Sequence, residues 1–182
     1  MTELSLHILD IAMNSVKAGA SEIQICISVE DKNDELRIGI RDNGKGMSKA
    51  ELDRILDPFY TTGNKKTGLG IPLLKQQAEQ AAGKFSVESK PDAGCLVQAT
   101  FRLSHIDRQP MGNIAGTMSS LIRSFPQIHW LFSFNGENEL FALDTDEIKA
   151  ELEGVHIDTP DVIEFIKSMI SENIEALSNK KL

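Results

Sequence analysis

The chain has 182 residues, of which 41% are hydrophobic and 25% charged, enough for one globular domain with a small addition. Its net charge of −8 divides into −1 over residues 1–110 and −7 over residues 111–182, which excludes the clustered Lys and Arg that a nucleic-acid backbone requires. No run approaches the roughly 20 apolar residues that span a membrane, and a signal peptide is not evident. Cys26 and Cys95 lie in apolar, strand-like segments, which favours a reducing, cytoplasmic location.

Residues 3–18 are predicted to form a largely buried helix, because their apolar residues recur at helical spacing. A second stripe, at spacings of three and four, is polar and consists of His7, Asp10, Asn14 and Lys17. Polar side chains on a buried helix need partners, because unpaired burial is costly. The stripe therefore either bonds to neighbouring backbone or faces a ligand.

A hairpin and a glycine-rich turn are predicted next. Residues 22–30 and 36–41 alternate as two strands joined by a turn at residues 31–34. Residues 42–47 read Asp-Asn-Gly-Lys-Gly-Met, a sharp turn in which glycines let the backbone approach a ligand closely.

A basic loop and a second glycine motif follow. Ser48 is expected to cap a short helix that stops before Pro58. Residues 57–67 form a polar, basic loop, and the Gly-Leu-Gly at residues 68–70 opens a helix that extends to about residue 81. Free N–H groups and the positive dipole end at a helix start favour phosphate. Loop, turn and helix start together predict a site for a nucleoside triphosphate.

Several motifs occur in a fixed order along residues 4–104. Residues 9–21, LDIAMNSVKAGAS, are followed by DNG at residues 42–44, DPFYTT at 57–62, TGLG at 67–70, and a glycine before the strand at 95–103. A DNG turn alone is common, but the ordered set is specific. This part of the chain resembles the ATP-binding fold of the GHKL superfamily, shared by gyrase, large ATP-dependent chaperones, histidine kinases and MutL mismatch-repair proteins. The first motif is similar to the MutL version of the asparagine box, and the later ones to histidine kinases and anti-sigma-factor kinases.

The resemblance implies an α/β two-layer sandwich, the Bergerat fold, with a mixed, mostly antiparallel sheet and helices on one face. We expect an ATP-binding domain at residues 1–104, a linker at 105–110 and a small acidic α-β-β-α-α appendage at 111–182. The predicted elements of the appendage are helices at 114–125, 146–153 and 161–177 and strands at 128–134 and 140–143. Its own core is expected from Trp130, Phe132, Phe134 and Phe141.

The resemblance also assigns residues to ATP and Mg²⁺. Asn14 matches the metal-binding asparagine, and its neutral oxygen suits a hard octahedral cation. Lys17 is placed to contact phosphate, and Asp42 matches the carboxylate that accepts a hydrogen bond from the adenine amino group. Taken alone, Asp42 is equally a turn-capping residue. The other residues expected around the nucleotide are Gly44, Gly46 and Met47 at the base, and Thr61, Thr62, Lys65, Lys66, Thr67, Gly68, Leu69 and Gly70 at the phosphates.

Two positions depart from the family pattern. Hydrolytic members place a glutamate four residues before the asparagine, where it orients the attacking water. Asp10 stands there and is one methylene shorter, so we expect it to act as a general base in slow hydrolysis. Cys95 stands where a threonine near the base is common, which removes that hydroxyl contact with adenine.

Residues 104–111, SHIDRQPM, resemble the phospho-accepting pattern of histidine kinases, although they follow the ATP-binding segment and residues 96–103 read as a strand. His105 is therefore a candidate phospho-acceptor, the alternative being a polar linker. His129 and His156 have no second ligand near them in sequence, so no metal site is predicted there.

We expect a Mg-ATP-binding protein that transfers the γ-phosphate to a separate protein, as histidine-kinase-like or anti-sigma Ser/Thr-kinase-like proteins do. The sequence shows no phospho-accepting helical hairpin ahead of the asparagine box, and in-line transfer needs only a positioned acceptor and charge stabilisation. One alternative is an ATP-gated binding module with slow hydrolysis. Another is a MutL-like clamp that forms a homodimer on ATP. No nucleic-acid or membrane partner is expected.

Overall fold

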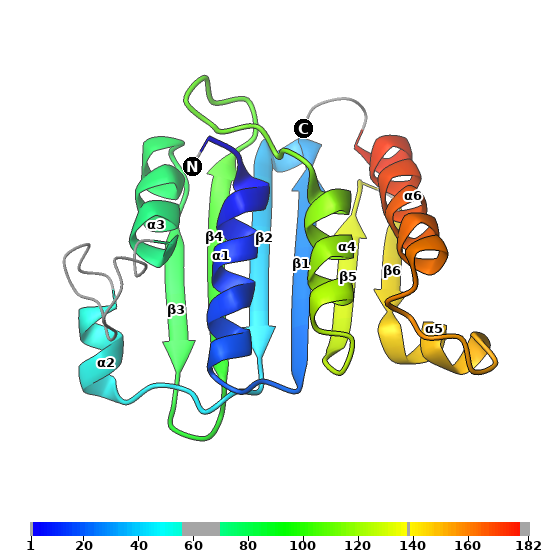
Figure 1. The fold of residues 1–182 in the computed structure, drawn as a ribbon. Coiled ribbons are helices and arrows are strands. Elements are labelled where there is room, and N and C mark those ends of the chain that lie inside the picture. The colour runs from blue at the N-terminus through cyan, green and yellow to red at the C-terminus, as the bar shows by residue number, and fades with distance from the viewer. Residues whose placement is uncertain (1, 56–69, 138, 179–182) are drawn as a thin grey trace.

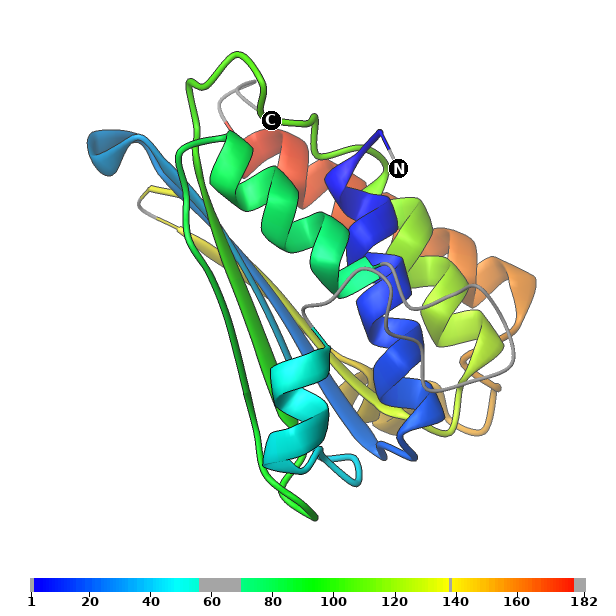
Figure 2. The ribbon, with the colours of Figure 1, turned by 90° about the vertical axis from the view of Figure 1, so that its left-hand side faces the viewer.

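The computed structural model describes residues 2–55, 70–137 and 139–178. Within them the chain forms two layers, a six-stranded sheet and the helices that cover one of its faces (Figures 1 and 2). The strands are β1 (Glu22–Glu30), β2 (Glu35–Asp42), β3 (Phe85–Ser89), β4 (Cys95–Arg102), β5 (His129–Asn135) and β6 (Leu140–Asp144). The helices are α1 (Leu4–Lys17), α2 (Lys49–Arg54), α3 (Gly70–Gln80), α4 (Ile114–Ser124), α5 (Thr145–Glu151) and α6 (Pro160–Leu177), with a 3₁₀ turn at Asp31–Asn33.

The sheet is mixed, with strand order β3-β4-β2-β1-β5-β6. Neighbouring strands are antiparallel except β1 and β5, which run parallel. Helices α1, α3, α4 and α6 lie on the same face of it (Figure 2). The predicted fold class, a mostly antiparallel α/β sandwich covered on one side, is confirmed.

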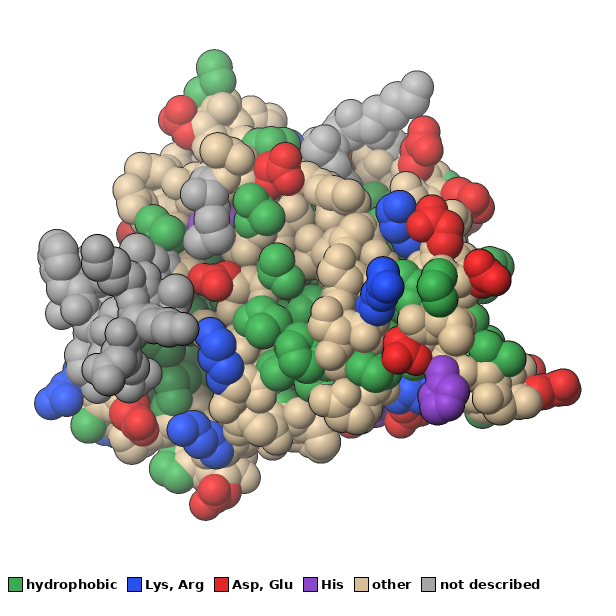
Figure 3. Space-filling view, viewed as in Figure 1, with side chains coloured by type: hydrophobic (Ala, Val, Ile, Leu, Met, Phe, Trp, Pro, Cys, Tyr) green, Lys and Arg blue, Asp and Glu red, His purple; other side chains and the backbone are tan. Residues whose placement is uncertain are grey.

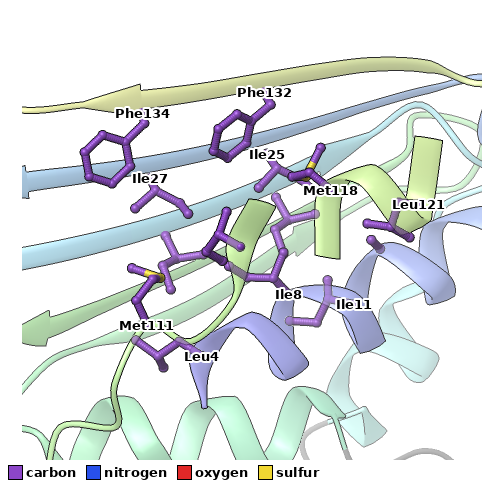
Figure 4. Close-up of a cluster of buried hydrophobic side chains, with 14 of the residues drawn as sticks. Leu4, Ile8, Ile11, Ile25, Ile27, Met111, Met118, Leu121, Phe132 and Phe134 are labelled. Atoms are coloured by element: carbon purple, nitrogen blue, oxygen red, sulfur yellow. The ribbon is translucent and has the colours of Figure 1, made fainter. Parts of the chain in front are cut away.

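The strands form because apolar and polar residues alternate along them, and successive side chains of a strand point to opposite faces. In β1 the apolar set Ile23, Ile25, Ile27 and Val29 is buried under the helices, while residues between them are more exposed. Ile8 and its neighbours on α1 pack onto this face (Figure 4). Burial of these side chains is what holds α1 against the sheet.

Residues 111–178 extend the same sheet and share its core. Strand β5 pairs with β1 from Glu22–His129 to Ser28–Asn135. Phe132 and Phe134 alternate on β5 and therefore reach the helix-covered face, beside the isoleucines of β1 (Figure 4). The aromatic residues expected to build a core of the appendage belong instead to the core of the whole sheet.

The segment at 105–110, predicted as a linker, leads into a stretch packed against α1. The N–H groups of Leu4 and Ser5 donate to the carbonyl oxygens of Pro110 and Met111, at 3.0 and 2.8 Å. Among the described residues no side chain caps this helix, so these bonds satisfy two of the donors that a helix start leaves free. The crossing from β4 to α4 is thereby fixed over the N-terminal end of α1.

Candidate functional site

The candidate site is organised around Asp42, the last residue of β2, whose side chain is buried at 8% exposure. The hydroxyl of Ser15 donates to Oδ2 at 2.5 Å, and the N–H of Gly44 donates to Oδ1 at 2.9 Å. Ser15 lies on the buried face of α1, so this bond joins Asp42 to that helix. Each carboxylate oxygen has two lone pairs, and one on each stays available to a further donor. The carboxylate can therefore accept a hydrogen bond from the amino group of a bound base.

The turn after Asp42 is fastened to the end of α1. The Asn43 side-chain oxygen accepts from the N–H groups of Ser21 and Glu22, at 2.9 and 3.0 Å. The N–H of Lys45 donates to the carbonyl of Ala18 at 3.0 Å. These contacts hold the turn against the end of α1 and so fix the position of the Asp42 carboxylate.

The glycines of the site are required by contacts within the protein. Gly46 has φ +65°, and a Cβ there would lie 1.9 Å from the carbonyl oxygen of Lys90. Gly94 has φ +75°, and a Cβ there would lie 1.9 Å from the carbonyl oxygen of Asp42. A Cβ on Gly44 would lie 3.0 Å from Ala18. We expected Gly44 and Gly46 to leave room for a base. In the structure, glycine at positions 46 and 94 lets the turn after β2 and the turn before β4 pack against each other, next to Asp42.

Cys95 lies opposite Asp42 in the β2–β4 register and is half-buried. Burial, assisted by the charge of Asp42, raises the pKa of the Cys95 thiol to about 11 despite a hydrogen bond with Ser89. The thiol therefore stays protonated at neutral pH. Ser89 also accepts from the N–H of Met47 at 2.9 Å and donates to the Gly94 carbonyl at 2.6 Å, which positions half-buried Met47 at the same edge of the site.

The polar stripe of α1 faces α3. A Cβ on Gly70, the first residue of α3, would lie 2.3 Å from Oδ2 of Asp10, so the carboxylate rests against the helix start. A negative charge is favourable there because it meets the positive end of the helix dipole. Asp10 and Asn14 are half-buried one turn apart, and Lys17 is exposed one turn further on. The stripe thus runs from the start of α3 to the Asp42 turn.

His7, the first residue of the stripe, is only 1% exposed. Its Nε2 lies 3.1 Å from Oε1 of Gln109, while its Nδ1 has no hydrogen-bond partner within the described part of the chain. Burial lowers the pKa of His7, although Gln109 and the backbone of Gly70 oppose the shift. His7 therefore lies between the segment before α4 and the start of α3, where Asp10 also lies.

The structure brings together Asp42, Gly44, Gly46 and Met47, and it joins Asp42 to Ser15, the residue after Asn14 in the sequence. It brings Asp10 and Gly70 together one helical turn away. Seven further predicted residues lie outside the described residues: Thr61, Thr62, Lys65, Lys66, Thr67, Gly68 and Leu69.

His105 is not brought to this site. It follows β4, whose first residue Cys95 pairs with Asp42 and whose last residue Arg102 pairs with Glu35 at the opposite end of β2. At about 3.3 Å per residue, the two ends of β4 are about 23 Å apart. The His105 Nδ1 accepts from the N–H of Asp107 at 3.2 Å within its own loop.

Sequence reasoning missed three residues of the site: Ser15, Asn43 and Ser89. The helical pattern places Ser15 on the buried face, and the signal that could have revealed its role is a hydroxyl at a buried position next to Asn14. From the sequence, Asn43 is only a turn residue and Ser89 only the end of a strand. Each of the three forms a hydrogen bond with a residue distant in the sequence, so no local sequence pattern reveals its role.

The donors fit a hard cation. Asn14, half-buried on α1, offers a neutral side-chain oxygen, and Mg²⁺ prefers oxygen ligands and keeps several waters or phosphate oxygens. No cluster of three or more His, Cys, Asp or Glu side chains in residues 2–55, 70–137 and 139–178 is arranged to hold a metal by itself. In the same residues no helix is both long and apolar enough to cross a membrane.

Sequence comparison places residues 2–105 within a family model described as histidine kinase-, DNA gyrase B-, and HSP90-like ATPase. The sensor histidine kinase ZraS of Klebsiella oxytoca is 32% identical over 90 residues, covering 49% of this chain and 20% of that protein. The cell-division control histidine kinase PdhS of Brucella ovis is 31% identical over 108 residues, covering 51% of this chain and 10% of that protein. The chain thus spans a fifth or less of these relatives.

Two solved structures share the fold. The Aquifex aeolicus MutL ATPase domain complexed with ADP has a TM-score of 0.51 at 13% identity, covering 84% of this chain and 68% of that one. The N-terminal domain of a DNA repair protein has a TM-score of 0.52 at 15% identity, covering 79% and 53%. At 79% and 84% of 182 residues, both alignments are longer than the family match and include residues after 105.

Proposed function

The chain belongs to the family of histidine kinase-, DNA gyrase B- and HSP90-like ATPases, and on this premise we propose that it binds Mg-ATP and transfers the γ-phosphate to a separate protein. The observation that carries the proposal is the buried Asp42 carboxylate, which Ser15 and Gly44 hold at the end of β2 with one further lone pair on each oxygen. Histidine kinases among the relatives support phosphotransfer as the reaction.

Asp42 supplies the selectivity for adenine. Its carboxylate accepts hydrogen bonds and donates none, so it favours a base with an amino group at the contacting edge. A base that presents a carbonyl oxygen there would place two acceptors against each other in a buried site, which is costly. The site should therefore prefer ATP and ADP to GTP.

The polar stripe of α1 would bind the phosphates and the metal. Asn14 is the residue that would hold Mg²⁺, and Lys17 adds a positive charge one turn away. Mg²⁺ would supply positive charge that offsets the charge of the phosphates. Asp10, on α1 beside the start of α3, would accept a proton from an attacking hydroxyl, imidazole or water. Transfer between oxygens in line needs little more than this positioning and charge.

A second candidate function is an ATP-gated binding module with slow hydrolysis, and the contact of Asp10 with Gly70 favours it. The contact joins Asp10, the candidate base, to the start of α3, where phosphate would bind. Binding of phosphate there would therefore change the position of α3. In this case the protein is a weak ATPase and not a protein kinase. The MutL-like clamp would add ATP-dependent dimerisation, which sedimentation with and without ATP detects.

Calorimetry with ATP, ADP and GTP tests the nucleotide site. Wild-type protein should bind ATP in a magnesium-dependent way, and Asn14→Ala should lower the affinity for Mg-ATP at least about tenfold. Asn173→Ala is the matched control, since Asn173 is a half-buried helical asparagine on α6. Folded wild-type protein that takes up neither ATP nor ADP refutes the proposal.

Phosphotransfer is tested with γ-labelled ATP and proteins captured with and without ATP. Label on a captured protein that is lost with Asn14→Ala supports transfer to a partner. Released phosphate without labelled protein supports the slow ATPase. Label on the chain itself that survives in His105→Gln rules out His105 as an acceptor.

A further inference from the structure

A groove of about 790 Å³ lies between α5 and α6, on the β5–β6 side of the sheet. Its apolar floor is formed by Ile148 on α5, Leu152 directly after that helix, and Val162 and Phe165 on α6. Phe165 is 67% exposed and is the bulkiest of the exposed apolar side chains in the described residues.

Helix α6 carries apolar side chains beyond those that anchor it to the sheet. The helix is anchored to the sheet by Ile163, Ile166 and Ile170, all buried. Val162 and Phe165 lie on the adjoining face, three residues apart, and are half-buried and exposed. Val162, like Ile148 and Leu152, also packs against the core, whereas Phe165 is exposed and is left for another molecule.

The rim of the groove is acidic. Glu147 and Glu151 are four residues apart on α5, where like charges repel. Glu151 is also the last residue of the helix, where a negative charge opposes the dipole. Asp161 lies on the opposite side, in the first turn of α6. Glu147 lies in the first turn of α5, where a negative charge is favourable, so only Glu151 and its repulsion from Glu147 are unfavourable for helix stability.

The basic residues of these helices do not neutralise the rim. Lys149 pairs with Asp146, and Lys167 with Glu164. Within the residues that the structure covers, no ion pair involves the three rim carboxylates. Acidic side chains gather over α5 and α6 in the space-filling view (Figure 3), in keeping with the net charge of −7 over residues 111–182.

We propose that the α5–α6 groove docks a basic amphipathic helix of the protein partner, an inference that rests on the proposed function for the partner's role. An apolar floor bounded by carboxylates is complementary to an apolar helix face flanked by Lys or Arg, and helix-in-groove recognition uses this geometry. The groove lies three strands from β2, about 14 Å across the sheet. A partner can therefore dock without covering Asp42.

A synthetic 18-residue helical peptide of leucine and lysine, labelled with fluorescein, serves as the probe, with a leucine–glutamate peptide as its charge control. Fluorescence anisotropy should show binding of the first peptide only. Phe165→Ser should weaken it about tenfold or more, and the double change Glu147→Gln, Glu151→Gln should weaken it and reduce its salt dependence.

Two variants outside the groove are the matched controls. Leu140→Ser removes an exposed apolar side chain of β6, 64% exposed, and Glu172→Gln with Glu175→Gln removes two exposed charges near the far end of α6. Both should bind the leucine–lysine peptide as wild type does. Circular dichroism confirms that each variant is folded, and the charge variant tests the groove even if Phe165→Ser unfolds.

Three results overturn the groove proposal. They are absence of peptide binding, equal loss in groove and control variants, and a wild-type dimer in sedimentation that Phe165→Ser converts to monomer, which would assign the groove to a second copy of the chain. The two proposals fail separately. Protein that binds the peptide but no ATP refutes only the nucleotide function, and protein that binds ATP but no peptide refutes only the groove.

Discussion

Replacing Ser15 by alanine tests whether Asp42 is held in place from α1. The Ser15 hydroxyl donates to Oδ2 of Asp42 at 2.5 Å, and both residues are buried, at 3% and 8% exposure. The alanine cannot donate, so Asp42 keeps only the N–H of Gly44 on its other oxygen. We expect both a loss of stability and a loss of affinity for ATP, because the carboxylate would no longer be fixed toward the base.

The size of the effect follows from the charge on the acceptor. A hydrogen bond to a charged group contributes about 1.5–3 kcal/mol to stability. Replacing serine by alanine in a helix stabilises the helix by about 0.5 kcal/mol, which offsets part of that loss. A net loss of about 2 kcal/mol lowers the melting temperature of a chain of this length by about 4–8 °C. A looser carboxylate should weaken ATP binding by up to about tenfold.

Urea unfolding and calorimetry with ATP measure the two effects. Ser119→Ala is the matched control, since Ser119 is a buried helical serine on α4 that donates to the carbonyl of Gly116 at 3.1 Å. Ser119→Ala should lower the free energy of unfolding by less than Ser15→Ala does, and it should leave the affinity for ATP unchanged. In an Asp42→Asn background, Ser15→Ala should cost about 1–2 kcal/mol less than in wild type. The reasoning is refuted if the two serine changes have equal effects on ATP binding, or if the cycle shows no coupling.

Three further results are expected. Gly46→Ala should destabilise the fold by more than about 2 kcal/mol in urea, because it combines a positive φ with a backbone clash, whereas Gly39→Ala, with nothing within 4 Å of the new methyl, should change stability by less than about 1 kcal/mol. Burial lowers the pKa of His129, but the hydrogen bond to Asp144 and nearby carboxylates outweigh it and raise that pKa. Its stabilisation is therefore complete below the unfolded pKa of about 6.5 and is lost as pH rises through the folded value; unfolding midpoints between pH 5.5 and 8.5 should show this slope in wild type and lose it in His129→Gln. The pKa of Cys95, raised to about 11, should make its alkylation at pH 8 much slower in folded than in urea-unfolded protein, and equal rates would contradict the burial.

The arrangement of elements along the chain was accessible from the sequence. Alternation over β1 and the three-and-four spacing over α1 depend only on local geometry, and the structure places these elements at residues 22–30 and 4–17. The capping of the short helix by Ser48 is also confirmed, with Glu51 completing a reciprocal pair of hydrogen bonds. These are contacts between residues close in sequence, so their residue types predict them.

Long-range pairing was not accessible. The parallel pairing of β5 with β1 joins residues more than 100 positions apart, and the sequence predicted a separate unit after residue 110 because no local pattern encodes the partner of a strand. The single core arises because β5 buries Phe132 and Phe134 against the isoleucines of β1.

For the site, the sequence by itself determined which residue types are available: the oxygen donors Asp10 and Asn14 one turn apart, a carboxylate in a glycine turn, and a glycine at a helix start. Only the tertiary structure decided what constrains them, namely Ser15 holding Asp42 and the carbonyl of Lys90 filling the space at Gly46. The physical reason is that periodicity and turn chemistry act over a few residues, whereas the position of a buried carboxylate depends on donors supplied by elements that meet only when the sheet and helices pack.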